Sequence, residues 1–391
     1  MKSPEKIVAL TKEYLFAHKD EMILFLKELV HIETPSDKIN SQHQILGYLG
    51  DRFTAMGYLA IHMYGKNTGG YLYARPKNRK KHLPHQLLIG HCDTVWPLGT
   101  IDKMPLSYIE GKIKGPGVYD MKAGITQIIF SLMAIRDMNI IPKVEPVIFI
   151  NSDEEIGSRE STNALKRLAK IANRAYVLEP PLGLNGKLKT ARKGLGRFTI
   201  TVRGKAAHAG LDPTKGVNAI VELSQQVQRL YAMNDLDKGI SVNIGMIEGG
   251  ISPNVIAPLS KAVIDVRVLK EADGDVLTKK IKALKPIHKD VVMEIEGGIG
   301  RPPMEKTPRN QHLWEMAKKQ GQQLGLDLEE ATAGGGSDAN TTSLYTATLD
   351  GLGTPGDGAH AAHEYILQNK LIERTALLTL LLLLEPLNKK T

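Results

Sequence analysis

The stretch VEPVIFINSDEEIGS, residues 144–158, runs from an apolar segment typical of a buried strand into three adjacent carboxylates, Asp153, Glu154 and Glu155. Adjacent carboxylates repel one another, and aspartate and glutamate are poor strand formers. A strand that ends in this way predicts a positive charge nearby, and further groups elsewhere in the chain that help to bind it.

Other segments place such groups at comparable positions. His91 and Asp93 follow the apolar LLIG, Glu179 follows AYVL, Asp120 stands just ahead of a helix in IKGPGVYDMKAG, and His360 comes after TATLDGLG and TPGDGA. Ligands of open parallel sheets bind beyond the carboxyl ends of the strands. We therefore expect these side chains to meet at one edge of one sheet.

The residue types at that edge indicate metal chemistry. Histidine nitrogen and carboxylate oxygen suit zinc. A single zinc takes three or four protein ligands, fewer than this set offers, whereas two metals that share a bridging carboxylate would use all of it. One of Glu154 and Glu155 would bind metal, and the other would take a proton from metal-bound water. Asp93 has the position of a carboxylate that orients the His91 imidazole.

The surrounding segments predict an α/β fold. Residues 1–60 have helical apolar spacing, and from residue 69 short apolar strands such as HQLLIG, VEPVIFI and RAYVL alternate with helical patterns such as GITQIIFSLMAIRDM. This alternation favours a mostly parallel sheet covered on both faces. The apolar run TALLTLLLLLEPL near the carboxyl end is shorter than the ~20 residues of a membrane span, so we expect a buried helix there.

Near residue 190 the pattern changes. From there the order is strand, helix, strand, strand, helix, strand, which is typical of a ferredoxin-like split unit, and the earlier alternation resumes after residue 300. We therefore expect a larger domain of residues 1–191 and 300–391, with a smaller α+β domain of residues 192–299 inserted into it.

Composition narrows the classes of function. With 42% hydrophobic and 24% charged residues, the chain is typical of a globular protein that is not embedded in a membrane. Its one cysteine, Cys92, excludes an intrachain disulfide and favours a reducing, cytoplasmic setting. The net charge of +9 and the basic stretch ARPKNRKKHLPH, residues 74–85, suggest an acidic partner. No recognition module accompanies that stretch, so we expect a solvated loop and an anionic small substrate, not nucleic acid.

Seven motifs, in chain order, resemble the co-catalytic di-zinc peptidase and deacylase family, which includes carboxypeptidase G, acetylornithine deacetylase, succinyl-diaminopimelate desuccinylase and the aminoacylases. They are GHCDTV, GPGVYDMKAG, INSDEEIGS, VLEP, GKAAHAG, GGGSDA and GAHAAHEYI. The resemblance spans nearly the whole chain. It implies a zinc-exopeptidase catalytic domain with an inserted lid or dimerisation domain.

The resemblance also implies roles for the site residues. The implied ligands are His91 and Glu179 for one zinc, Glu155 and His360 for the other, and Asp120 as the bridge between them. Glu154 would be the general base, with Asp93 behind His91. The family has a cis peptide bond after the bridging aspartate, here between Asp120 and Met121. We expect two zinc ions per chain, with cobalt and manganese as alternatives.

The inserted domain of dimeric family members sends a histidine, here His208, into the partner's active site, where it polarises the scissile carbonyl group. Asn254 in SPNVIAP and Arg267 in IDVRV match the family's substrate-binding asparagine and arginine. The resemblance therefore implies a homodimer formed through the inserted domain. A monomer with a hinged lid is the alternative.

Within the family, the glutamate-releasing carboxypeptidase G branch is the best match. Lys187 matches a lysine that this branch places near the glutamate side chain, and Arg301 matches its binder of the terminal carboxylate. The backbone at Gly336 would approach that carboxylate closely, because glycine has no side chain. In GAHAAHEYI the chain departs from the branch and has the deacylase spacing, which leaves His363 as the competitor of His360.

Together these observations predict a hydrolase that cleaves the amide bond of N-acyl or peptidyl amino acids, releasing a carboxyl-terminal glutamate, through a metal-bridged hydroxide and Glu154. A deacetylase or desuccinylase of amino-acid biosynthesis is the alternative enzyme. A catalytically silent dimeric binding protein is the alternative from another class. A serine hydrolase is disfavoured, because the chain has no Gly-x-Ser-x-Gly elbow.

Overall fold

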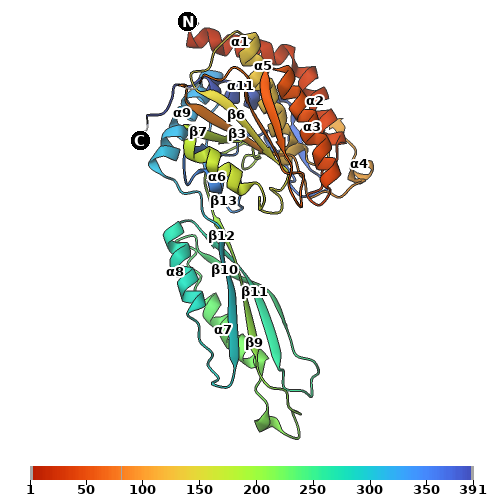
Figure 1. Cartoon of the computed structure of the whole chain (residues 1–391), viewed down its shortest axis with the longest axis vertical. Coiled ribbons are helices and arrows are strands. Elements are labelled where there is room, and N and C mark those ends of the chain that lie inside the picture. Colours follow the sequence, from red (N-terminus) through yellow and green to blue (C-terminus); the bar gives the residue numbers. More distant parts are fainter. Residues whose placement is uncertain (1–2, 81, 389–391) are drawn as a thin grey trace. The chain divides into compact units, whose positions relative to one another are not determined.

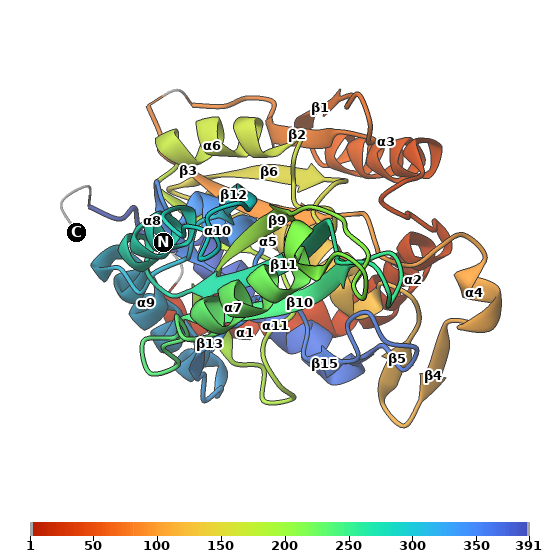
Figure 2. The same ribbon diagram turned by 90° about the horizontal axis from the view of Figure 1, so that it is seen from below.

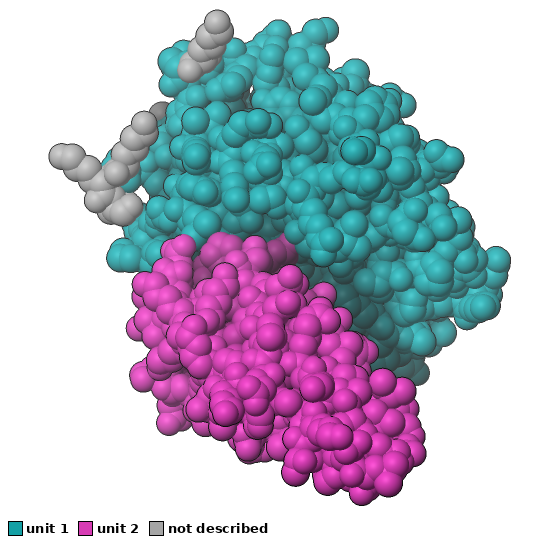
Figure 3. All heavy atoms as spheres, turned by 60° about the horizontal axis from the view of Figure 1, so that its bottom comes forward, with its two compact units in different colours: residues 1–190, 306–332, 337–391 teal, residues 191–305, 333–336 magenta. Residues whose placement is uncertain are grey.

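The computed structural model describes residues 3–80 and 82–388 of the chain (Figure 1). The chain divides into two compact units, which Figure 3 draws in different colours. Unit 1 consists of residues 1–190, 306–332 and 337–391, and unit 2 of residues 191–305 and 333–336. Each unit has a hydrophobic core of its own.

The second boundary differs from the one expected. Residues 300–305 and 333–336 lie in unit 2, although we expected residues 300–391 to belong to the larger domain. Strand β12 (Val292–Arg301) continues past residue 299 because it stays paired with β9 (Gly194–Arg203) as far as Arg301. Residues 333–336 join unit 2 through bonds such as that from the Lys193 N–H to the Ala333 carbonyl, at 2.9 Å.

The main sheet of unit 1 has six strands in the order β1-β2-β6-β3-β7-β14. Their bounds are β1 (Tyr58–Met63), β2 (Tyr71–Pro76), β3 (His85–His91), β6 (Glu145–Asn151), β7 (Arg174–Val177) and β14 (Ala347–Leu349). The strands from β6 to β14 run parallel, and β1 and β2 form an antiparallel edge. Every residue of β3 and β6 is buried, as expected of central parallel strands.

Helices cover both faces of this sheet. Figure 2 shows α3 (Ile39–Ala55) and α6 (Thr162–Ile171) on one face, and α5 (Ala123–Asp137) and α11 (Gln368–Leu382) on the other. The other helices are α1 (Pro4–Ala17), α2 (Lys19–His31), α4 (Thr100–Lys103), α9 (Pro308–Leu324) and α10 (Asp338–Thr342). The short strands are β4 (Ser107–Ile109), β5 (Lys112–Lys114), β15 (Gly356–Asp357) and β16 (Tyr365–Leu367), which form one sheet, and the pair β8 (Leu188–Arg192) and β13 (Glu330–Ala333).

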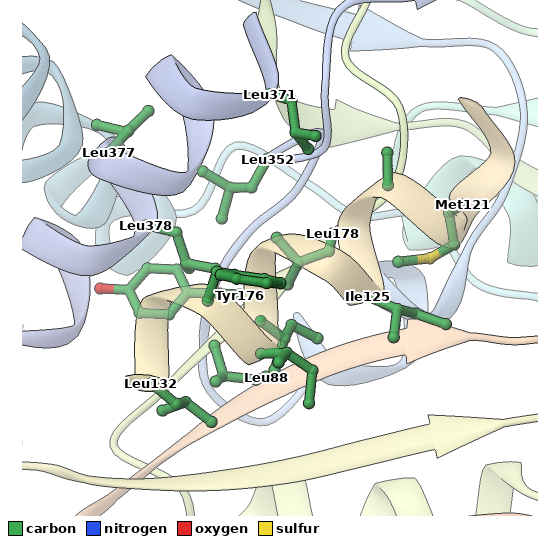
Figure 4. Close-up of a cluster of buried hydrophobic side chains, with 14 of the residues drawn as sticks. Leu88, Met121, Ile125, Leu132, Tyr176, Leu178, Leu352, Leu371, Leu377 and Leu378 are labelled. Carbon is green, nitrogen blue, oxygen red and sulfur yellow. The ribbon is translucent and has the colours of Figure 1, made fainter. Parts of the chain in front are cut away.

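The core of unit 1 lies between the sheet and the helices α5 and α11 (Figure 4). Leu88 and Tyr176 from the strands meet Ile125 of α5 and Leu378 of α11 there, and all four are almost completely buried. The buried helix expected at the apolar carboxyl-terminal run is thus confirmed as α11. Among the described residues, the helix Val118–Asp137 is long and apolar enough to cross a membrane, but 89% of its most apolar window is buried in the protein.

Unit 2 has the order of elements that the sequence predicts. It contains β9, α7 (Ala219–Tyr231), β10 (Ser241–Gly249), β11 (Leu259–Val268), α8 (Glu271–Lys282) and β12. Its antiparallel sheet has the order β10-β11-β9-β12, with the first and third strands in the centre, as in a ferredoxin-like split unit. Alternate residues of β9 and β11 are buried, because one face of the sheet packs against α7 and α8.

Candidate metal centre and active site

Three neighbouring parallel strands of unit 1, β6, β3 and β7, end at the same edge of the sheet. His91 is the last residue of β3, and Glu155 and Glu179 follow closely after the ends of β6 and β7. Asp120 comes to this edge from the irregular helical turn Val118–Lys122. His360 comes from the loop after β15, with a φ of 61° that is uncommon for a residue other than glycine.

These five side chains form two groups that share Asp120. In one group, the Nε2 atom of His91 lies 3.1 Å from Asp120 Oδ1 and 3.5 Å from Glu179 Oε1. In the other, the Nε2 atom of His360 lies 3.1 Å from Glu155 Oε2 and 3.5 Å from Asp120 Oδ2. Each group brings three donor atoms within 4.8 Å of one another. The two oxygens of one carboxylate therefore serve two adjacent sites.

The donors fit a pair of divalent metal ions. Each group offers one imidazole nitrogen and two carboxylate oxygens, a set that suits zinc and leaves coordination positions open for water or substrate. Glu155 Oε1 is also buried without a hydrogen-bond partner among the described residues. A buried carboxylate oxygen is costly unless something positive pairs with it, and a metal ion would supply that charge.

Without metal, protons on the two histidines balance the carboxylates. Burial alone would lower the pKa of His91, but its bonds to Asp120 and Asp93 raise that pKa well above its ordinary value. Bonds to Asp120 and then Glu155 raise the pKa of His360 to about 10. Burial alone would raise the pKa of Asp120, but the same two histidines hold it well below its ordinary range. Burial raises the pKa of Glu155, against the hydrogen bond from His360.

The carboxylate of Asp93 anchors the acidic turn. It accepts hydrogen bonds from the backbone N–H groups of Glu154 and Glu155, at 3.2 and 3.1 Å, and from the Ser36 hydroxyl at 2.7 Å. The His91 Nδ1 atom lies 3.0 Å from the Asp93 backbone carbonyl oxygen and 3.4 Å from Asp93 Oδ1. Asp93 thus lies behind His91, where the sequence placed it, and it also fixes both adjacent glutamates.

The three adjacent carboxylates have separate environments. Asp153 accepts bonds from the Glu160 and Ser161 N–H groups at 2.8 and 3.2 Å, so it shapes the turn that leads into α6. Glu155 belongs to the metal-ligand group, and Glu154 is half-buried beside it. Of the three, Glu154 therefore remains for proton transfer.

Sequence reasoning missed the supporting role of Glu364. Its buried carboxylate accepts hydrogen bonds from the Gly117, Tyr119 and Asp120 N–H groups at 2.9, 2.9 and 3.1 Å, and from Trp96 Nε1 at 2.8 Å. These bonds hold the loop that carries Asp120. The only signal in the sequence is its place at the end of the GAHAAHE motif.

The structure distinguishes the competing histidines and places Lys187. His360 joins the shared group, whereas His363 is exposed and lies 3.8 Å from Asp357. The Asp120–Met121 peptide bond is cis, as the resemblance implied. The ammonium group of Lys187 pairs with Glu329 of the same unit and is not part of either ligand group.

In unit 2, His208 and Asn254 lie side by side. The Ala209 N–H donates to the Asn254 carbonyl at 2.9 Å, and the Asn254 side chain accepts a hydrogen bond from the Ser252 hydroxyl. His208 Nδ1 accepts hydrogen bonds from the Gly210 and Leu211 N–H groups, each at 3.1 Å. A neutral His208 ring therefore carries its proton on Nε2, which makes that atom a donor.

Arg267, Arg301 and Gly336 also lie in unit 2, but at the opposite end of β11 from His208 and Asn254. Arg267 donates to both Asp265 oxygens, at 2.7 and 3.0 Å, and its Nη1 lies 3.4 Å from the Gly334 carbonyl oxygen. Arg301 lies against Gly336, where an added Cβ would come within 2.9 Å of Arg301 Cδ. The added Cβ would also come within 2.8 Å of Leu195 Cδ1, so a larger residue at position 336 would require these two side chains to shift.

Related sequences point to one family. The peptidase dimerisation domain of the M20 family matches residues 190–286. Carboxypeptidase G2 of Pseudomonas sp. (strain RS-16) is 28% identical over 348 residues, which cover 87% of this chain and 83% of that protein. A succinyl-diaminopimelate desuccinylase of Aliarcobacter butzleri is 24% identical over 337 residues, 81% of this chain and 86% of that protein.

Solved structures share the fold. The aminopeptidase PepT of Bacillus cereus has a TM-score of 0.81 at 22% identity, with 93% of this chain and 98% of that one covered. A dinuclear metal-binding peptidase of the M20 family from Bacillus subtilis has a TM-score of 0.67 at 15% identity, with 94% and 98% covered. At these identities the likeness is one of fold, an α/β unit with an inserted α+β unit.

We predict that Glu364→Gln weakens metal binding by about 10–100-fold, because an amide accepts fewer hydrogen bonds than the carboxylate that fixes the Asp120 loop. Competition with a chelator of known affinity measures the change. Glu315→Gln on the exposed side of α9 is the control with the same chemical change. Unaltered affinity in Glu364→Gln would contradict the role of this carboxylate.

Metal uptake should also release protons. Because the pKa values of His91 and His360 are raised, both rings are protonated near neutral pH, and both must become neutral to bind metal. We expect about two protons per chain to leave at about pH 7.5, and metal affinity to rise with pH until His360 has titrated. Calorimetry in buffers of different ionisation enthalpy measures the number, and a value near zero would refute this charge balance.

Proposed function

We propose that this chain cleaves the amide bond joining an acyl or peptidyl group to an amino acid and releases a carboxyl-terminal glutamate. Its fit to the M20 family of metallopeptidases and deacylases supports the proposal. The observation that carries the proposal is the pair of three-donor groups sharing Asp120, with Glu154 adjacent to the ligand Glu155. Such a pair is suited to hydrolysis by two metals. Zinc is the proposed metal, two ions per chain, and the dinuclear relative of the same fold supports that number.

Each chain residue has a role in the proposed reaction. When bound, the metals would acidify a water molecule and polarise the scissile carbonyl group. Glu154 accepts the proton of the attacking water and then gives it to the leaving amine, as a general base followed by a general acid. His208 donates a hydrogen bond from Nε2 to the carbonyl oxygen, since Nδ1 is already an acceptor for two backbone N–H groups. No covalent intermediate is needed.

The free carboxylate of the substrate requires cationic and backbone donors. Arg301 beside Gly336 supports the proposed carboxylate site, because a guanidinium can bind a carboxylate through two parallel hydrogen bonds. Asn254 lies beside His208 in unit 2 and would contact the substrate near the scissile bond. Arg267 is engaged with Asp265 and would bind through its remaining N–H groups.

The choice of glutamate depends on the residues that would contact the substrate side chain. The similarity to carboxypeptidase G2 favours glutamate. The ion pair of Lys187 with Glu329 competes with any contact of that lysine to a substrate side chain. The desuccinylase relative keeps a deacetylase or desuccinylase as the second candidate.

We further propose that the protein is a homodimer through unit 2. Strand β10 is an edge strand with free pairing positions, and its residues from Gly245 to Gly249 are almost all exposed. Met246, Ile247 and the nearby Ile251 are between 59% and 76% exposed. Ile220 and Val221 of α7 are exposed as well, at 43% and 53%. An apolar edge strand of this kind is covered by pairing with a second copy in many dimers.

We also propose a cytoplasmic setting for the protein. The support is Cys92, which is free and buried.

Glu154→Gln should lower kcat by at least about 10²–10⁴-fold while about two metals per chain remain bound, because the base is lost and the ligands are not. Turnover of folyl-glutamate, a peptidyl-glutamate, N-acetylornithine and N-succinyl-diaminopimelate is measured side by side, with metal counted by elemental analysis. The control is Glu315→Gln. Cleavage of N-acetylornithine alone would overturn the glutamate assignment, and an active Glu154→Gln would exclude Glu154 as the base.

Hybrid dimers test whether His208 acts across the interface. His208→Ala and Glu154→Gln should each be nearly inactive, but co-expressed they should regain about a quarter of wild-type activity. About half of the dimers are then hybrids, in which one of the two sites has an intact Glu154 and an intact His208 from the partner. Activity of differently tagged, purified hybrids measures this. Inactive hybrids would mean that His208 acts within its own chain, and an active His208→Ala homodimer would mean that His208 has no role.

A further inference from the structure

A second concave site lies at the opposite edge of the unit 1 sheet. The metal-ligand groups stand beyond the carboxyl ends of β6, β3 and β7, whereas this cavity opens at the amino ends of β3, β7 and β14. Its lining includes His85, Asn173 and Ala347 from those strand starts, the end of α6 and the start of α9. Its volume of about 710 Å³ is that of a small-molecule site.

The lining of this cavity is cationic. Arg79, Lys170 and Arg309 line it together with two histidines, and none of the fifteen lining residues is a carboxylate. Arg79 has an acidic neighbour outside the lining, Glu145, at 3.7 Å. Within the described part of the chain, no carboxylate lies in ion-pair range of Lys170 or Arg309, so two positive charges face the cavity without compensation.

The two uncompensated cations are held in place by the protein. The Nη2 atom of Arg309 donates to the Ser343 carbonyl, which fixes the guanidinium, while Nε is buried with no hydrogen-bond partner among the described residues. Lys170 places its ammonium group 5.3 Å from the centre of the Tyr345 ring, a cation–π contact. With Nη2 bonded to Ser343, the Nη1 N–H groups of Arg309 are the guanidinium donors that a ligand in the cavity would use.

The floor of the cavity is rigid. Asn173 exchanges two hydrogen bonds of 2.9 Å with the backbone of Leu387, and the Thr346 hydroxyl donates to the Ala172 carbonyl at 3.0 Å. His85 is 6% exposed, and burial followed by the charge of Arg79 lowers its pKa. A neutral histidine here can donate one hydrogen bond without adding charge.

We propose that this cavity binds a phosphorylated small molecule, with the phosphate between Arg309 and Lys170. A guanidinium and an ammonium group together are the usual recognition pair for phosphate. The basic stretch of residues 74–85, which the sequence left without a ligand, contributes Arg79, His82 and His85 to the same lining. A hollow of this size with one tyrosine ring in its lining suits a small molecule better than a nucleic-acid strand, which needs a long groove with several stacking side chains.

Binding of AMP and of inorganic phosphate to the metal-loaded full chain tests the proposal. Calorimetry at constant ionic strength should give saturable binding of at least one of the two. Arg309→Gln should weaken it about tenfold or more, and Lys170→Gln about threefold, since Lys170 is more exposed to solvent. Lys166→Gln, on the same helix as Lys170 but outside the lining, removes the same charge and should leave the affinity unaltered.

The two probes distinguish the sources of the phosphate. Tighter binding of AMP supports a phosphorylated organic ligand, and equal binding supports free phosphate. Lys170→Gln keeps the test valid if Arg309→Gln does not fold. The proposal is refuted if neither probe binds at millimolar concentration, if Lys166→Gln loses as much affinity as Lys170→Gln, or if an oligonucleotide binds more tightly than AMP. Binding that is lost with the metals but kept in both cavity variants would place it in the hydrolytic site and refute the proposal as well.

Discussion

Repulsion among the carboxylates around Asp120 is the constraint on which the centre of unit 1 depends. Asp120 has a ligand atom within 4.8 Å of Glu179 in one group and within 4.8 Å of Glu155 in the other, in a largely buried setting, and uncompensated buried charges are among the most costly features of a folded chain. Without metal, His91 and His360 compensate them as imidazolium ions. With metal bound, the metal would supply the positive charge and the two histidines would be neutral ligands. The same residues therefore serve two states that differ in what carries the positive charge.

Two further carboxylates hold in place the loops that carry these residues. Asp93 bonds to the backbone of the turn with Glu154 and Glu155, and Glu364 bonds to the backbone of the loop with Asp120. Backbone N–H groups are fixed in number and direction, so a carboxylate that accepts two or three of them holds a loop in one conformation. The ligands depend on these supports as much as on the strands.

The strand ends were predictable from sequence because buried parallel strands are continuous apolar runs. The first polar residues after such a run therefore mark the end of the strand. His91, Glu155 and Glu179 were found in this way, and the element order of unit 2 followed from its alternating patterns. Glu364 was missed, because bonding to backbone leaves no periodic signal. The boundary at residue 299 was wrong because the pairing of β12 with β9, a long-range contact, extends it to Arg301. The partner of Lys187, Glu329, is likewise far away in sequence.

The pairing of β9 with β12 has a consequence for how such a chain arises. Leu195 lies opposite Arg301, so the first and last strands of unit 2 begin and end next to each other. A module whose two termini are neighbours fits into the gap of a single surface loop, and the host sheet keeps its strand order unbroken. Residues 191–305 therefore form one continuous insertion, and the strands β7 and β14 on either side of it in the sequence still pair as neighbours.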